Sequence, residues 1–477
     1  MEAYLIIDIG TGNARVAVAA PDGEILSIER ENVGYEKDDA YPDSIYFNPD
    51  ELWGQIKRLM EVALQRLPGV KVTAITATSQ REGIVLLGKK GESLIGLPNI
   101  DHRGREWEDL IADKSHVYTL TGRRPTSLFS ALKLVGIRNR RPEIWDRFST
   151  FLSISDWVQY KLSGVVRYEH SQASETLLYD VAGKSWSKEL CGLFELDPSV
   201  CPELQCSGTV LGGVLPEYTT RLPFSSAAVV IIGGADTQLA IKSTRPSVDD
   251  RVIVSGTTTP IIQIVDTYVI DDRERTWTSR HTEGGKFILE ANAGVTGLNY
   301  QRLKEIFYPN ENYSVIEKEL AEVNDFSCVA ALGSLLADEK MPLTRGGFVF
   351  NVPVTHQLHR AHFVWSTLWD ITCSIRENYR TLCSVSSFEG DVVWACGGGM
   401  QSPLLRQLIA NLLNKKVQIR SNYRQSSVAG GVEICNTVLN KGGYETSPPE
   451  IIYPEDPKHF AALYEEWKTA RAVFRRV

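Results

Sequence analysis

The chain of 477 residues lacks the features that mark secreted, metal-binding or membrane proteins. Its eight cysteines form no Cys-x-x-Cys pair and follow no regular spacing, which excludes the usual zinc and disulfide frameworks and favours reduced thiols in a cytoplasmic protein. No apolar run reaches the ~18 residues that span a bilayer. Because a strand pattern begins almost at the N-terminus, we expect no signal peptide. The formal net charge of −8 argues against nucleic acid or an anionic membrane as a partner.

Two familiar nucleotide-binding motifs are also absent. The apolar strand Leu5–Ile7 leads into Asp8-Ile9-Gly10-Thr11-Gly12-Asn13, but Arg15 stands where a dinucleotide fingerprint has its third glycine. No Lys-Ser/Thr pair follows to make a P-loop. Residues 83–90 have the spacing G-x-x-x-x-G-K, yet Lys90 replaces the Ser/Thr and an apolar strand fills the interval. We therefore interpret residues 83–90 as a strand and its turn.

The segment after Leu5–Ile7 is instead predicted to be a hairpin, because a second strand starts at once at residue 15. The backbone N–H groups and the Thr11 hydroxyl of such a turn can face a phosphate. Asp8 stands where the hydrated Mg²⁺ of that phosphate needs a carboxylate. An ordinary hairpin turn is the alternative interpretation.

Strands alternate with helices along the chain, which predicts an α/β fold. We expect strands at 4–10, 15–20, 72–78 and 84–88, and an amphipathic helix from Glu51 to Leu67 that Asn48 caps. A second strand and Gly/Thr turn, residues 252–259, repeats the opening pattern half a chain later. This duplication predicts two domains, 1–244 and 245–477, packed with a cleft between them.

Asp236 is the candidate general base. It ends a strongly apolar strand, where burial raises the pKa of a carboxyl group toward useful values. The preceding Gly233 and Gly234 are expected to let a ligand approach the backbone. An Asx turn or a helix cap is the alternative role for Asp236.

The turns at residues 5–13, 229–238, 252–259 and 392–403, in this order, resemble the FGGY family of carbohydrate kinases over nearly the whole chain. The segments 79–86, 99–103 and 154–157 make the N-terminal half most similar to autoinducer-2 kinases, and next to glycerol and xylulose kinases. The resemblance implies an α/β fold of two actin-like (ribonuclease H-like, hexokinase-type) domains. It also implies a kinase that uses ATP and Mg²⁺ to phosphorylate a hydroxyl group of a small sugar or polyol, and a possible homodimer.

The resemblance also assigns roles to individual residues of this chain. Asp236 is the catalytic base, and with Asp8 it is expected to hold Mg²⁺ through water. The substrate-binding residues it implies are Arg81, Glu82, Asp101, Arg103 and Phe129. The ATP-binding residues it implies are Thr11, Gly12, Asn13, Arg15, Gly256, Thr257, Thr258, Gly297, Gly397, Gly398, Gly399 and Ser402. The glycines at 397–399 are expected to pack under adenosine.

Several residues that are typical of the family are replaced, and these differences leave the identity of the substrate open. Gln425 replaces the usual Glu before the last Gly-rich helix, and Gly136 replaces a Trp. An autoinducer-2-like substrate is one candidate, and a ketopentose, a polyol or a sugar acid is the alternative. A non-catalytic sugar or nucleotide sensor of the same fold is a further alternative. The spacing His356-x-x-His359-x-x-His362 favours a helix start over a metal site.

Overall fold

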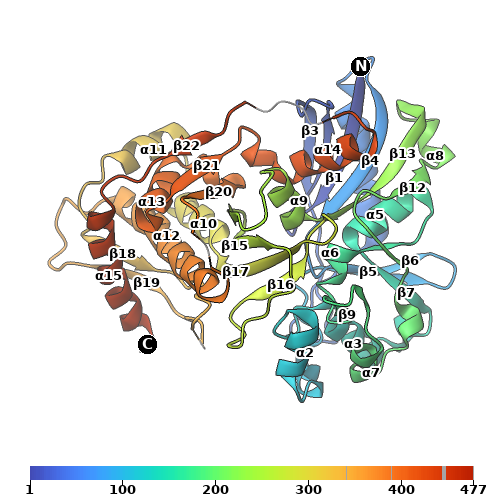
Figure 1. The fold of residues 1–477 in the computed structure, drawn as a ribbon, viewed down its shortest axis with the longest axis horizontal. Coiled ribbons are helices and arrows are strands. Elements are labelled where there is room, and N and C mark those ends of the chain that lie inside the picture. Colours follow the sequence, from blue (N-terminus) through green and yellow to red (C-terminus); the bar gives the residue numbers. More distant parts are fainter. Residues whose placement is uncertain (340, 388, 443–446, 476–477) are drawn as a thin grey trace.

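The computed structural model describes residues 1–339, 341–387, 389–442 and 447–475. These residues form two α/β halves that lie side by side, each built on one large mixed sheet (Figure 1). The N-terminal strands form the sheet on the right of that view, and the later strands form the sheet on the left. The α/β class predicted from the sequence is therefore confirmed.

The first sheet has six strands in the order β12-β13-β4-β1-β2-β3. Strand β4 lies parallel to both β1 and β13, whereas β1, β2 and β3 form an antiparallel meander. The strands are β1 (Glu2–Ile9), β2 (Asn13–Ala19), β3 (Ile25–Asn32), β4 (Lys71–Ser79), β12 (Val210–Gly213) and β13 (Phe224–Ala235).

The second sheet has seven strands in the order β16-β17-β15-β14-β20-β21-β22. It repeats the core of the first: an antiparallel β14-β15-β17 meander is followed by the parallel strands β20 and β21. The strands are β14 (Arg251–Val254), β15 (Thr258–Val265), β16 (Trp277–Arg280), β17 (Phe287–Val295), β20 (Val392–Cys396), β21 (Lys416–Ile419) and β22 (Glu450–Ile452). The internal duplication expected from the two Gly/Thr turns is thus present in the sheets.

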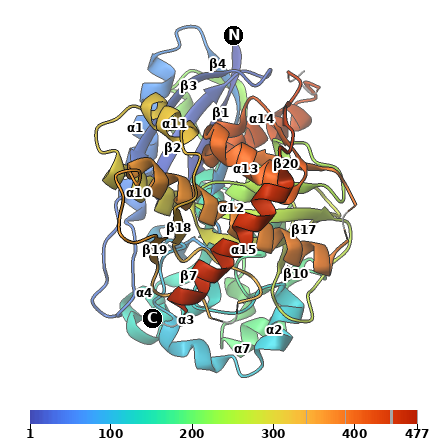
Figure 2. The same cartoon turned by 90° about the vertical axis from the view of Figure 1, so that its left-hand side faces the viewer.

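Short sheets and helices cover these two cores. The remaining strands are β5 (Ile84–Gly88), β6 (Ser93–Leu97), β7 (Phe148–Ser153), β8 (Tyr168–Glu169), β9 (Tyr179–Asp180), β10 (Ser185–Trp186), β11 (Leu204–Gln205), β18 (Cys328–Ala331) and β19 (Gly347–Phe350). The helices are α1 (Pro49–Gln65), α2 (Lys114–Thr121), α3 (Ser130–Arg140), α4 (Pro142–Trp145), α5 (Ile154–Ser163), α6 (His170–Ala173), α7 (Lys188–Leu193), α8 (Pro216–Thr219), α9 (Asp236–Lys242), α10 (Gly297–Phe307), α11 (Tyr313–Ala321), α12 (Arg360–Val385), α13 (Pro403–Leu413), α14 (Ser426–Val438) and α15 (Pro457–Phe474). Figure 2 shows α12, α13 and α15 covering the second half.

Local sequence signals explain where several elements begin. Asn48 Oδ1 accepts hydrogen bonds from the Asp50 and Glu51 N–H groups at 2.9 and 3.4 Å, so α1 starts where the cap predicts. The predicted first hairpin is confirmed, because β1 and β2 pair antiparallel with Asp8 opposite Arg15. Residues 84–88 form β5, which ends in a turn, so the G-x-x-x-x-G-K match is not a P-loop.

Helix α14 joins the two halves. It comes late in the sequence, yet its apolar residues pack in one cluster with those of β1, β2 and β4 in the first sheet. The Tyr4 hydroxyl donates to Asn436 Oδ1 at 2.8 Å, and Gly430 lies close enough to α9 that a Cβ would be 2.0 Å from the Leu239 carbonyl oxygen. Residues on either side of the proposed 244/245 boundary therefore share one core, and the boundary itself stays a prediction.

Candidate active site

Three strand ends bring the candidate residues together. In the parallel part of the first sheet, Ile9 of β1 pairs with Ser79 of β4, and Ser79 pairs with Ala235 of β13. The segments that follow these three residues therefore leave the same edge of the sheet. They are the first Gly/Thr turn, the pair Arg81 and Glu82, and Asp236. The fold thus gathers residues that are more than 200 positions apart in the sequence.

Asp8 is buried, with only 1% of its surface exposed, and belongs to a polar network that reaches into the C-terminal part of the chain. Its Oδ2 accepts hydrogen bonds from Arg15 Nη2 and from Ser427 Oγ, each at 2.6 Å. Arg15 Nη1 also donates to Gln425 Oε1 at 3.1 Å. Gln425, noted in the sequence only as a departure from the family pattern, therefore contacts the first Gly/Thr turn through Arg15.

The rest of the first turn is held by its own neighbours. Gly10 N–H donates to the Asn13 carbonyl at 3.0 Å and closes the turn. The Thr11 hydroxyl donates to Asn99 Oδ1 at 3.1 Å, and the Tyr35 hydroxyl donates to the Thr11 carbonyl at 2.6 Å. Gly12 is exposed, and no atom would lie within 4 Å of an added Cβ. The turn is therefore preorganised and open at its tip.

Asp236 begins α9 and is half-buried. Its Oδ1 accepts hydrogen bonds from the Thr237 N–H at 2.6 Å and from the Thr237 hydroxyl at 3.3 Å. Burial and the nearby negative charge of Asp8 raise the pKa of Asp236 to about 6, against the opposing effect of Arg81. Asp236 is thus close enough to both Asp8 and Arg81 to interact with them electrostatically.

The glycines before Asp236 have a different role from the one expected. An added Cβ at Gly233 would lie 1.9 Å from the Ala77 carbonyl oxygen of the neighbouring strand. At Gly234 it would lie 2.8 Å from the Thr282 methyl group and 3.1 Å from Ser171 Oγ. These two glycines therefore make room for protein atoms, which corrects the expectation that they make room for a ligand.

Arg81 lies in a buried cluster of charges that spans both sheets. Its Nη1 and Nη2 donate to Glu290 Oε2 and Oε1 at 2.6 and 3.1 Å, a bidentate pair with a carboxylate of β17. Its Nε lies 3.9 Å from Glu82 Oε1, and its Nη1 lies 4.0 Å from Glu175 Oε1. Glu175 is also paired with Arg123. The sequence offered no local signal for Glu175, Arg123 or Glu290, because only the tertiary fold brings them to Arg81.

Asp101, Arg103 and Phe129 are all fully buried. Arg103 Nε donates to Asp101 Oδ2 at 2.8 Å, and Asp101 Oδ1 accepts from the Ile45 N–H at 2.9 Å. Phe129 packs edge-on against Trp277 with ring centroids 6.0 Å apart. In this structure the three side chains contact protein atoms, so their predicted contact with substrate remains a prediction.

The second Gly/Thr turn and the last Gly-rich turn pack against each other. The strands β14 and β20 end at the paired residues Val254 and Cys396, and the Gly399 N–H donates to the Ser255 carbonyl at 2.9 Å. An added Cβ would lie 2.4 Å from the Ser255 carbonyl oxygen at Gly397, where φ is 96°, and 2.0 Å from Ser255 Oγ at Gly399. Only Gly398 is open, with no atom within 4 Å.

Gly297 and Ser402 support these turns from behind. A Cβ at Gly297 would lie 2.0 Å from the Gly256 carbonyl oxygen, so this glycine is needed for contact with the second turn. Ser402 is buried and caps α13, accepting a hydrogen bond from the Leu405 N–H at 3.4 Å. The residues at the surface of the second turn are Gly256 and Thr257, with Thr258 partly exposed.

The residues at the first sheet edge fit a magnesium ion. Asp8 Oδ1 is buried and has no hydrogen-bond partner, an arrangement that a nearby cation or its water would satisfy. Carboxylate oxygens are the ligands that Mg²⁺ prefers, and the ion usually keeps several waters and takes only one or two carboxylates. Among the described residues no group of three or more His, Cys, Asp or Glu side chains could hold a metal. A role of Asp8 and Asp236 in holding the ion stays a prediction.

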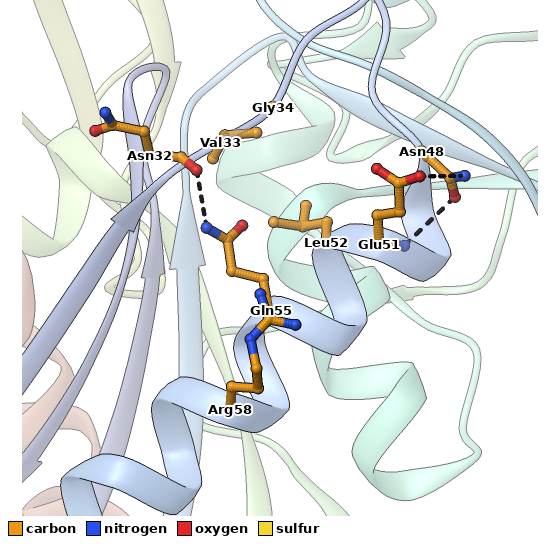
Figure 3. Close-up of a pocket in the computed structure, with 8 residues that line it drawn as sticks. All are labelled: Asn32, Val33, Gly34, Asn48, Glu51, Leu52, Gln55 and Arg58. Carbon is orange, nitrogen blue, oxygen red and sulfur yellow. Dashed lines mark hydrogen bonds between the residues drawn. The ribbon is translucent and has the colours of Figure 1, made fainter.

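A small cavity of about 150 Å³ lies away from these residues, between β3 and the start of α1 (Figure 3). Gln55 reaches across it and donates to the Asn32 carbonyl at 2.8 Å. Its wall includes Val33, whose N–H donates to the Gly12 carbonyl of the first turn at 3.2 Å. The cavity therefore lies next to Val33, which supports that turn, and its wall includes none of the predicted site residues.

Over the described ranges, no helix is both long and apolar enough to cross a membrane.

Comparisons with known proteins show to which family the chain is similar. The FGGY family of carbohydrate kinases matches over residues 3–242 for its N-terminal domain and 309–437 for its C-terminal domain. The protein named "Putative sugar kinase YoaC" from Bacillus subtilis (strain 168) is 50% identical over 473 residues, which cover 99% of this chain and 97% of that protein. The autoinducer-2 kinase of Salmonella typhimurium (strain LT2) is 22% identical over 503 residues and covers 99% of this chain and 94% of its own.

Solved structures confirm the predicted fold of two actin-like domains. The ligand-bound xylulose kinase from Lactobacillus acidophilus superposes with a TM-score of 0.85 at 16% identity, covering 100% of this chain and 99% of that one. Together with the two matching family domains, these similarities confirm the family predicted from the order of the turns. The chain therefore belongs to the FGGY family of carbohydrate kinases, the enzymes that transfer a phosphoryl group from ATP to a sugar or polyol.

Proposed function

We propose that Asp236 is the general base that takes the proton of the acceptor hydroxyl, and that Asp8 with Asp236 holds Mg²⁺ through water. The observation that supports this assignment most is the meeting of three strand ends at one sheet edge, which puts Asp236 within electrostatic reach of both Asp8 and Arg81. Phosphoryl transfer needs the phosphates held in line and the acceptor oriented, and it needs little covalent chemistry from the protein.

Each part of the site has a task in this scheme. The two Gly/Thr turns bind the phosphates of ATP, and the open face at Gly398 receives adenosine. Mg²⁺ neutralises charge on the transferred phosphate when it is bound. Arg81 and Glu82 orient the acceptor, with a guanidinium that donates and a carboxyl that accepts hydrogen bonds.

The acceptor is proposed to be a linear polyhydroxy compound, and an autoinducer-2-like hydroxylated pentanedione is the first candidate. Its support is the similarity to autoinducer-2 kinases along nearly the whole chain. Ketopentoses, polyols and sugar acids are the alternatives. An ADP-release assay with Mg-ATP across these compounds tests the assignment, and the expected result is release that one class stimulates. ATP hydrolysis that no compound changes would contradict it.

The activity is expected to fall on acidification below about pH 6. A general base works only when ionised, and burial together with Asp8 raises the pKa of Asp236 to about 6. The value of kcat/KM for the acceptor should therefore drop about tenfold per pH unit below that pKa. A pH profile with the assay at saturating Mg-ATP measures it. An acidic limb near pH 4, the ordinary range of an exposed Asp, would contradict the assignment.

Gly398 provides a direct test of the adenosine site. Because no protein atom lies near its missing side chain, Gly398→Ala should leave the melting temperature unchanged and raise the KM for ATP about tenfold by filling space that the base needs. Gly192→Ala is the matched control, since Gly192 on α7 also has no atom within 4 Å. An unchanged KM for ATP in Gly398→Ala would place adenosine elsewhere.

A further inference from the structure

The end of β13, which carries Asp236, follows a bulge in the first sheet. Ile231 of β13 pairs with Thr76 of β4. The next pair, Gly234 with Thr78, comes three residues later on β13 but only two later on β4. Such an extra residue disrupts the ladder of backbone hydrogen bonds, and bulges next to active sites redirect a side chain in this way. The backbone before Asp236 is therefore placed by a bulge and not by a regular ladder.

Two side-chain hydroxyls hold the peptide unit that joins Gly234 to Ala235. The Thr78 hydroxyl of β4 donates to the Gly234 carbonyl at 2.8 Å. At the other end of the same unit, the Ala235 N–H donates to Ser171 Oγ of α6 at 3.1 Å. Thr78 and Ser171 are both fully buried. Because a peptide unit is planar, holding it at both ends fixes the direction in which the next residue, Asp236, leaves the strand.

The Ser171 hydroxyl is itself oriented by Glu169. It donates to Glu169 Oε2, which also accepts hydrogen bonds from the N–H groups of Ser171 and Gln172 at 2.7 and 3.1 Å. Because its proton points to the carboxyl group, the Ser171 oxygen presents a lone pair to the Ala235 N–H. The same short helix also holds β4, since Gln172 Nε2 donates to Ser79 Oγ at 3.0 Å. Helix α6 therefore supports the ends of two neighbouring strands.

Asp236 depends on this backbone for its position. Among the residues that the structure describes, the hydrogen bonds to its carboxylate come only from Thr237, the next residue, at 2.6 and 3.3 Å. These bonds move with the first turn of α9 and do not tie the carboxylate to another element. A general base must lie within about 2.6–3.2 Å of the oxygen whose proton it takes, and a misplacement of ~1 Å can cost about a hundredfold in rate.

We propose that Thr78 and Ser171 are positioning residues for the general base, because their hydroxyls hold the peptide unit before Asp236 and so aim its carboxylate at the acceptor hydroxyl. The inference rests on the proposed role of Asp236 as the base. Glu169 acts one step further away, by orienting the Ser171 hydroxyl.

The test compares variants of the full chain that lose or keep these hydroxyls. Ser171→Ala and Thr78→Val each remove one hydroxyl with little change in volume, and each should lower kcat about tenfold to a hundredfold. Thr78→Ser keeps the hydroxyl and should retain the kcat of the wild type. ADP release is measured with Mg-ATP and whichever ketose, polyol, sugar acid or hydroxylated pentanedione stimulates the wild type most. The affinity for ATP, measured by calorimetry, should be unchanged in all three variants.

Ser174→Ala is the matched control, because Ser174 follows α6 directly and is also buried. Its Oγ accepts a backbone N–H in the same way, that of Arg280 on β16, at 3.1 Å. Losing that bond should lower the melting temperature about as much as Ser171→Ala does, and it should leave kcat unchanged.

A double variant shows whether the hydroxyls act through Asp236. Ser171→Ala should change kcat by less than about twofold once Asp236→Asn has removed the base. Hydrogen exchange measured by mass spectrometry follows the peptide unit without turnover. Residues 230–238 should exchange faster in Ser171→Ala and Thr78→Val, and at the rate of the wild type in Ser174→Ala.

Several results would overturn the inference. They are an unchanged kcat in Ser171→Ala or Thr78→Val, an equal fall in Ser174→Ala, the same fall in the Asp236→Asn background, and unchanged exchange over residues 230–238 in Ser171→Ala. A wild type that releases no ADP with any of these compounds would contradict the proposed function, and it would remove the positioning role with it, whatever the exchange rates show.

Discussion

Replacing Asp236 by Asn is expected to lower kcat by about 10²–10⁴-fold while ATP still binds, because the acceptor hydroxyl loses the group that takes its proton. The folded protein should not be destabilised. The folded-state pKa of Asp236, about 6, lies above the ordinary 3.8, so ionising this group makes folding less favourable as the pH rises from about 4 to 6. At neutral pH the uncharged Asn removes that cost, and the melting temperature should stay level or increase.

Measuring kcat together with the melting temperature separates a loss of chemistry from a loss of structure. ATP affinity from calorimetry and a thermal melt accompany the ADP-release assay. Asp370→Asn is the matched control, because Asp370 is buried in the second half, where its Oδ1 accepts from Trp467 Nε1 at 2.8 Å. That variant should leave kcat unchanged. Near-normal kcat in Asp236→Asn would show that another group is the base.

The sequence predicted those parts of the fold that depend on short segments. The first hairpin and helix α1 with its Asn48 cap are local patterns, and each is present where it was expected. The duplication was visible because each half begins with an apolar strand and a Gly/Thr turn. The order of the turns along the chain was enough to predict the family, because that order reflects which strand ends meet at the edge of a sheet.

The electrostatic partners could not be predicted in the same way. Arg81 is adjacent to Glu82 in the sequence, and the resemblance implied that the two hold the substrate together. In the structure its nearest carboxylate is Glu290, 209 positions later. Similarly, nothing near Asp8 in the sequence indicates Ser427, which donates to it from α14. Such pairs depend on how the two halves pack, and a single sequence carries no signal for that.

The glycines show the same limit of prediction from a single sequence. A glycine-rich turn indicates that some atom comes close to the backbone, but not which atom. At Gly233, Gly397 and Gly399 that atom belongs to the protein, whereas Gly398 faces open space. A ligand was the expected neighbour of all four. Only the structure separates the glycine that a ligand can reach from those that hold the fold.

Asp8→Asn is expected to lower kcat about a hundredfold or more and to raise the Mg²⁺ concentration needed for half-maximal rate. The change removes the carboxylate placed for the ion and weakens the half-buried pair with Arg15, so the melting temperature should also fall. Mg²⁺ titrations of ADP release and a thermal melt measure the two effects.

The matched control for this variant is Asp38→Asn. Asp38 is also a buried partner of arginines in the first half, so its loss should lower the melting temperature without changing the Mg²⁺ dependence. Asp8→Asn should also move the acidic limb of the pH profile below pH 6, because removing the charge of Asp8 lowers the pKa of Asp236. If the pH profile and the Mg²⁺ requirement were both unchanged from the wild type, Asp8 would have only a structural role in the first hairpin. A shift in both would tie the carboxyl ends of β1 and β13 to one catalytic centre.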